Sequence, residues 1–163
     1  MITMLFLAFL TAPQVHVAVP SVSVVSQLEC GTSHFAVVQV SNRSENESIF
    51  FPLSPLYTKG LTIHNVRLEV EHHGRWSLVG RGSDIPGSGV RELRPGGRFM
   101  DYFLLPNPDQ AVTLKGSPLR LVIPYKVNDS FEQVRTEEFR VSNLVARSDL
   151  TCPTTLNASS SAK

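Results

Sequence analysis

The sequence predicts an all-β protein, an antiparallel β-sandwich of about eight strands. Three observations support this fold class. Apolar and polar residues alternate with a period of two in several short segments, as they do in half-buried strands. Segments rich in glycine, proline and asparagine separate these strands at intervals of roughly 8–12 residues, which is typical of sandwiches and barrels. No stretch of about ten or more residues combines helical periodicity with capping residues.

The first half of the chain predicts four strands. They are short segments of alternating or aromatic residues, at 33–41, 49–51, 66–71 and 76–79. We expect Pro52 and Pro55 to end the second of them, because proline cannot donate a hydrogen bond to a β ladder. The polar composition of residues 42–48 predicts a loop, and His72–Arg75 is a turn of hairpin length.

The second half of the chain predicts four further strands. They occupy the apolar or alternating segments 90–93, 99–105, 119–126 and 139–144. Glycine and proline mark the loops at 80–89 and 95–97. Pro124 interrupts one face of its strand and therefore predicts a strand end or a sheet edge.

The composition limits the protein to a few classes. Its 163 residues suit one domain, and a hydrophobic content of 42% is enough for one core, which excludes wholesale disorder. A net charge of +1 gives no electrostatic reason to expect nucleic acid as a partner. Two cysteines exclude a disulfide-dense mini-scaffold and any metal site with four thiolates.

The start of the chain predicts export. Residues 4–10 are an unbroken apolar run, with the length of the hydrophobic region of a signal peptide. The run is too short for a stable membrane span, which needs about 20 apolar residues. We therefore expect a signal peptide over residues 1–20, a secreted or periplasmic β-sandwich domain over 21–150, and a polar disordered tail over 151–163. The alternative at the start is a buried N-terminal segment or an anchor.

The two cysteines bracket the strand region. Cys30 precedes the first clear strand and Cys152 follows the last one. The first and last strands of an antiparallel sandwich are often neighbours, so we expect a disulfide between these residues. In the chain-entropy model such a bond contributes roughly 4–5 kcal/mol. Two unpaired thiols in a cytosolic protein are the alternative.

A skeleton of residues between 35 and 105 resembles known domains. It consists of Val38-x-Val40-x-Asn42-x-Ser44, then Gly74-x-Trp76, then Leu93-x-Pro95-Gly96. This order is similar to immunoglobulin-like domains of secreted bacterial proteins, and it also looks like the intracellular proteinase inhibitor family of bacilli. The resemblance implies an immunoglobulin-like sandwich. The recognition loop of the inhibitor family has no counterpart that aligns residue by residue, so the resemblance implies no binding residues.

No catalytic motif stands out. The glycine-rich segments 80–84 and 87–89 do not match the Gly-x-Ser-x-Gly nucleophile elbow, and no helix follows them. His72 and His73 are adjacent, and adjacent side chains on a strand point to opposite faces, so together with His64 they make a poor metal site. The sequence therefore predicts a protein that is not an enzyme and that needs no metal or other cofactor.

A local excess of arginine is the clearest binding signal. The chain between residues 75 and 98 carries five arginines against two acids, Asp84 and Glu92. The arginines are Arg75, Arg81, Arg91, Arg94 and Arg98. Guanidinium forks suit carboxylate and phosphate groups, so we expect these residues and Asp84 to bind a protein or an anionic surface polymer. A solvated sheet face balanced by acids elsewhere is the alternative.

The sequence therefore predicts an exported, non-catalytic binding or structural accessory module, with its oligomeric state left open. The alternative is a protease inhibitor or enzyme-accessory domain that uses the long loop 80–89. We expect Trp76 in the core and not on a sugar-binding surface. Four Asn-x-Ser sequons, at Asn42, Asn46, Asn128 and Asn157, could carry glycans in a eukaryotic secretory pathway or reflect turn composition in a bacterium.

Overall fold

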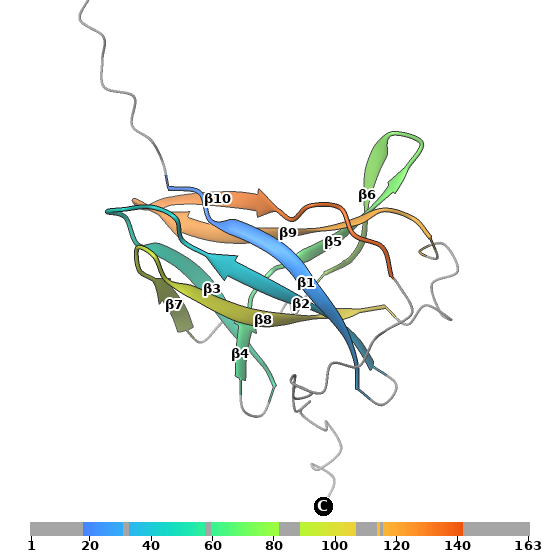
Figure 1. The fold of residues 1–163 in the computed structure, drawn as a ribbon, viewed down its shortest axis with the longest axis horizontal. Helices are drawn as coiled ribbons and strands as arrows, with labels where there is room; N and C mark the ends of the chain where they lie inside the picture. The colour runs from blue at the N-terminus through green and yellow to red at the C-terminus, as the bar shows by residue number, and fades with distance from the viewer. Residues whose placement is uncertain are drawn as a thin grey trace, which may run out of the picture.

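The computed structural model describes residues 18–30, 33–57, 60–81, 89–106, 114 and 116–141. Its ten strands pair in antiparallel fashion and form two sheets, and the described residues contain no α-helix. Figure 1 shows the two sheets lying face to face. The predicted all-β sandwich is thus confirmed.

The two sheets differ in size. The first has the order β1 (Ser21–Cys30), β2 (Ser33–Ser41) and β8 (Arg98–Leu105). The second contains β3 (Ile49–Tyr57), β4 (Gly60–Ile63), β5 (Arg67–His72), β6 (Arg75–Arg81), β7 (Gly89–Leu93), β9 (Leu119–Val127) and β10 (Ser130–Arg135). Its order is β4-β3-β9-β5-β6, with β7 paired to β3 and β10 paired to β9.

The hydrophobic core lies between the sheets. Alternate residues of β2 and β9 point into it, as the sequence pattern predicts. Phe51 of β3 is fully buried, and its ring meets Phe99 edge to face, with 5.4 Å between centroids. The ring of Tyr125 lies 6.4 Å away on β9. This aromatic group joins β3, β8 and β9 at the centre of the sandwich.

Several boundaries differ from the prediction. Strands β1, β4 and β10 were not predicted, and Cys30 ends β1 instead of preceding the first strand. The expectation that Pro52 and Pro55 end a strand is wrong, because β3 continues through both to Tyr57. The carbonyl oxygen of Pro52 can still accept a hydrogen bond, and it accepts one from the His64 N–H at 2.7 Å. Around Pro55 the register with β4 shifts, so that no ladder bond depends on its missing N–H.

Two tight turns connect neighbouring strands by residues with positive φ. His73 and Gly74, with φ of 51° and 78°, link β5 to β6 and confirm the predicted hairpin. Asn128 and Asp129, with φ of 47° and 66°, link β9 to β10. Two consecutive left-handed residues give the turn whose twist matches that of antiparallel strands.

The ends of the chain are described only in part. Ala18 precedes β1, and its N–H donates to Glu47 Oε2 at 3.0 Å. Residues 1–17 and 142–163 lie outside the described residues, so the signal peptide and the polar tail stay predictions. Of the strand predicted over 139–144, the described part, 139–141, forms only an isolated bridge between Phe139 and Leu119 and no strand. Cys30 packs against a second apolar cluster on β1 and β2, while Cys152 lies outside the described residues, and their disulfide stays a prediction. In the described part of the chain, no helix is long and apolar enough to cross a membrane.

Asp101 joins the two sheets by hydrogen bonds. Its side chain on β8 is buried and accepts the N–H of Ile63 from β4 at 2.7 Å and that of Tyr102 at 2.8 Å. Burial raises the pKa of the Asp101 carboxyl above its ordinary value, although these hydrogen bonds, the Thr62 hydroxyl and the charge of Arg91 act in the opposite direction.

We expect Asp101→Asn to destabilise the fold by about 1–3 kcal/mol, because an amide accepts from only one of the two N–H groups and turns a donor toward the other. The loss should be smaller at neutral pH than below the ordinary pKa of 3.8. A raised folded-state pKa means that the native protein loses stability as the carboxyl ionises with rising pH, whereas the amide does not titrate. Urea unfolding of both proteins across this pH range measures the difference, and a loss that grows with pH would contradict the raised pKa.

Candidate binding site

A groove of about 350 Å³ lies on the outer face of the second sheet. Residues Leu121 and Ile123 of β9 point into the core, so Val122 and Pro124 between them face outward. Strand β9 pairs with β5 as far as Val122 and with β3 at Lys126, which leaves no described partner for Pro124 on that edge. The groove opens at this interruption, and the proline suits it because no ladder bond is lost. It is lined by Asn65, Arg67, Arg81, Pro124, Phe131, Glu132 and Gln133.

Pro124 was predicted to mark either a strand end or a sheet edge. The residue lies inside β9, so it does not end the strand. It does lie where one edge of β9 has no partner among the described residues.

Two arginines stand side by side in the groove. Arg67 of β5 and Arg81 of β6 are directly opposite each other in the register. Such cross-strand pairs have Cβ atoms about 4.5–5.5 Å apart, and like charges in these positions repel. The Arg67 guanidinium donates to Gln133 Oε1 at 2.9 Å, which fixes its direction. None of the ion pairs between described residues includes either arginine, so an anion placed between them would relieve their repulsion.

The rim of the groove adds an aromatic surface. Phe131 of β10 is 77% exposed and presents its ring to solvent at the edge of the groove. Lys126 Nζ lies 6.0 Å from its ring centroid and also forms an ion pair of 2.7 Å with Asp129. Glu132 is the one carboxylate among the lining residues.

A neighbouring arginine on the same face already has its charge neutralised by a carboxylate. Arg120 of β9 pairs with Glu69 of β5 at 2.7 Å, and its Cζ lies 4.0 Å from the ring centroid of Trp76. Trp76 is half-buried and lies opposite Glu71 in the register, on the outer face. The expectation that this tryptophan belongs to the core is wrong, because the guanidinium of Arg120 covers its ring on the outside of the sheet.

The structure does not gather the five predicted arginines into one patch. Of these residues only Arg81 lines the groove. Arg75 is exposed at the start of β6, beside the hairpin turn. The other three, Arg91, Arg94 and Arg98, belong to β7, to the following turn and to the start of β8. Strands β6 and β7 lie at opposite ends of the second sheet (Figure 1). The arginines that are close together along the sequence are therefore far apart in the fold.

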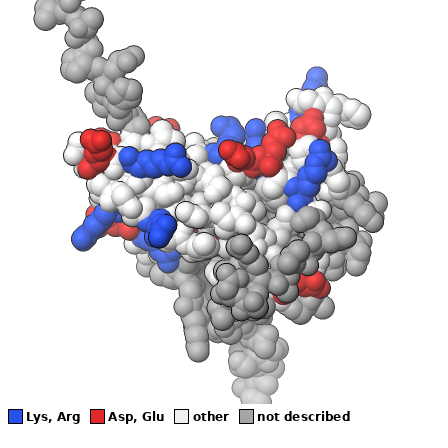
Figure 2. All heavy atoms as spheres, viewed as in Figure 1, with Lys and Arg blue, Asp and Glu red and all other residues white. Residues whose placement is uncertain are grey.

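The loop that carries Asp84 is outside the described residues, which end at Arg81 and resume at Gly89. The roles predicted for Asp84 and for the inhibitory loop 80–89 therefore stay predictions. In the view of Figure 2, cationic and anionic side chains are interspersed over the visible described surface. This mixture on that side agrees with the near-neutral total charge of the chain.

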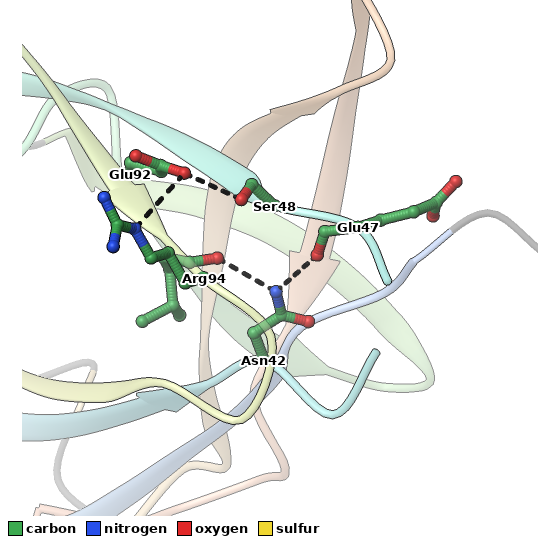
Figure 3. A network of polar contacts seen from close by, with 6 residues as sticks. Asn42, Glu47, Ser48, Glu92 and Arg94 are labelled. Carbon is green, nitrogen blue, oxygen red and sulfur yellow. Dashed lines mark hydrogen bonds and ion pairs between the residues drawn. The ribbon is translucent and has the colours of Figure 1, made fainter. Parts of the chain in front are cut away.

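Two of the separated arginines serve the fold. Arg91 Cζ lies 4.6 Å from the ring centroid of Phe99. Arg94 Nε lies 3.8 Å from Glu92 Oε1, the same oxygen that accepts a hydrogen bond from Ser48 Oγ at 2.8 Å (Figure 3). The Ser48–Glu92 hydrogen bond joins the end of β7 to the start of β3, and the contact of Arg91 with Phe99 joins β7 to β8.

Asn42 organises the same end of the sandwich. Its side chain is 1% exposed, and Nδ2 donates to the carbonyls of Glu47 at 2.7 Å and of Leu93 at 2.9 Å (Figure 3). Its Oδ1 accepts the N–H of Ser44 at 2.9 Å. The backbone of Asn42 also exchanges hydrogen bonds with Gly96 and Gly97. All polar atoms of this amide are used within the fold, whereas Asn46 and Asn128 are exposed.

The histidines that the structure describes do not gather into a metal site. His72 and His73 are exposed at the β5–β6 turn. Across the residues that the structure describes, no three His, Cys, Asp or Glu side chains are close enough to hold a metal ion.

Comparison with known proteins adds no assignment. No protein-family model matches this chain, and no curated protein matches its sequence. The resemblance to immunoglobulin-like domains therefore stays a prediction. The contacts of Asn42 nevertheless give a physical reason for two parts of the skeleton, because they join Asn42 and Ser44 to Leu93 and Gly96.

Proposed function

We propose that this protein is an exported, non-catalytic binding module that takes an anionic partner in the groove of its second sheet. The observation that carries the proposal is the direct opposition of Arg67 and Arg81 at a groove with an exposed aromatic rim. The apolar start of the sequence supports export.

The chemistry of the lining favours binding over catalysis. Two guanidinium groups and the amides of Asn65 and Gln133 supply donors for an oxyanion. The lining residues include no serine, cysteine, histidine or lysine that could act as a nucleophile or as a base beside Glu132. A partner would therefore be held by charge-assisted hydrogen bonds and by contact with Phe131.

We expect the native protein to be retained on a heparin resin at low salt and to be released as salt rises, because salt screens exposed charges. The double variant Arg67→Ser/Arg81→Ser should lose at least about tenfold in affinity, since each hydrogen bond to a charged group contributes about 1.5–3 kcal/mol. The matched control is Arg94→Ser/Arg98→Ser, which removes the same charge far from the groove. Absence of retention for the native protein, or equal losses in both double variants, would refute the groove as the binding site.

A further inference from the structure

We infer that the partner is a linear anionic polysaccharide that crosses the strands and is bound by a row of three arginines. This inference rests on the proposed function and names its ligand class. The third arginine is Arg135 at the end of β10. Val122 of β9 has two register partners, Arg67 on β5 and Arg135 on β10, while Arg67 in turn pairs with Arg81 on β6.

The row follows from the pleat of the sheet. Residues directly opposite each other on neighbouring strands share a face, so Arg81, Arg67 and Arg135 lie on the same outer face of the sheet as Val122, which is itself fully buried. Four adjacent strands at about 4.8 Å spacing place the ends of the row about 14 Å apart. Arg81 and Arg135 are exposed and Arg67 is half-buried. The three cations therefore form a line perpendicular to the strands.

Three of the acids near the row have other partners, whereas Glu132, the one carboxylate that lines the groove, forms no ion pair with a described residue. Glu69 pairs with Arg120 at 2.7 Å, and Asp129 pairs with Lys126 at 2.7 Å. The Glu71 carboxylate accepts the N–H of Gly74 in the hairpin turn. No ion pair between described residues reaches Arg81 or Arg135. Among these acids only Glu132 offsets the charge of the three arginines, so the row keeps a net positive charge for a ligand.

The shape of this surface favours a polymer over a small anion. A single carboxylate or sulfate can bridge Arg67 and Arg81 but cannot also reach Arg135, two strands from Arg67. A chain that runs across the strands makes no backbone ladder with them, so it must be recognised through repeated anionic groups. Phe131 lines the groove with Arg67 and Arg81 but lies four residues along β10 from Arg135, so its exposed ring can contact the C–H face of a sugar only in the part of the chain that is bound at the groove. Sulfated or carboxylated sugars combine both features.

The test uses heparin oligosaccharides of increasing length, with binding measured by calorimetry. We expect affinity to rise with length until the chain spans about 14 Å and then to level off. Arg135→Ser should weaken the binding of long chains about 3–10-fold and leave the disaccharide unchanged. It should also lower the salt dependence of long-chain binding by about one unit of slope. Arg98→Ser is the matched control and should change neither value, and thermal unfolding checks that each variant folds.

The outcomes separate the two proposals. If Arg67→Ser/Arg81→Ser abolishes binding while Arg135→Ser has no effect at any length, the groove stands and the row is refuted. Equal affinity for short and long chains also refutes the row. If poly-L-glutamate or single-stranded DNA of equal charge binds more tightly than the oligosaccharide, the polysaccharide assignment is wrong while the anion-binding groove remains.

Discussion

Replacing Asn42 with alanine is expected to destabilise the fold by about 3–4 kcal/mol. The substitution removes both Nδ2 donors and the Oδ1 acceptor, and it leaves the carbonyl of Leu93 without this donor inside the protein. The loop that follows β2 then loses its attachment to the end of β7. Urea unfolding gives the change in the free energy of unfolding, and a loss below about 1 kcal/mol would show that water replaces the amide at little cost.

Two further substitutions isolate the cause. Asn42→Asp preserves shape but turns a carboxylate toward the carbonyl oxygens of Glu47 and Leu93. At neutral pH we expect it to be at least as harmful as alanine, with partial recovery in acid, where a protonated carboxyl can donate once. Asn46→Ala changes an exposed asparagine of the same loop and should alter stability by less than about 0.5 kcal/mol.

Periodicity was sufficient to predict the strands whose two faces differ. In β5 and β9 one set of alternate residues meets the core, so the pattern shows both the strand and its inward face. Strand β10 has almost no buried residue, and β1 mixes half-buried positions on both faces, so neither gives a clear alternation. The prediction that the prolines end β3 failed for another reason. A missing N–H matters only where the partner strand would accept its hydrogen bond, and composition does not specify the partner strand.

The groove could not be predicted because it depends on register. Arg67 meets Arg81 only because the pairing of β5 with β6 shifts between Leu68 and Glu69. Without that irregularity, alternation alone would assign Arg81 a different partner and a different face. Sequence proximity was misleading in the same way. The chain passes from β6 at one side of the second sheet to β7 at the other, so arginines that are close along the chain are separated in the fold.

Phe51→Ala is expected to destabilise the protein by about 3–5 kcal/mol, the range found when a buried phenylalanine is truncated. The ring is fully buried and contacts Phe99 and Tyr125, so its removal leaves a cavity at the point where β3, β8 and β9 meet. The core cannot close this cavity cheaply, because these neighbours belong to both sheets. Urea unfolding should show a lower midpoint with an unchanged slope.

Phe131→Ala is the matched control, because the same atoms are removed from a ring that is 77% exposed. We expect its free energy of unfolding to change by less than about 0.5 kcal/mol. Its affinity for heparin oligosaccharides should nevertheless fall about 3–10-fold, because the C–H face of a sugar loses the apolar surface that the ring offers. The pair thus separates a phenylalanine that holds the sheets together from one that serves the groove. Equal stability losses in both variants would mean that Phe131 supports the fold, and the aromatic rim would then be no argument for a ligand.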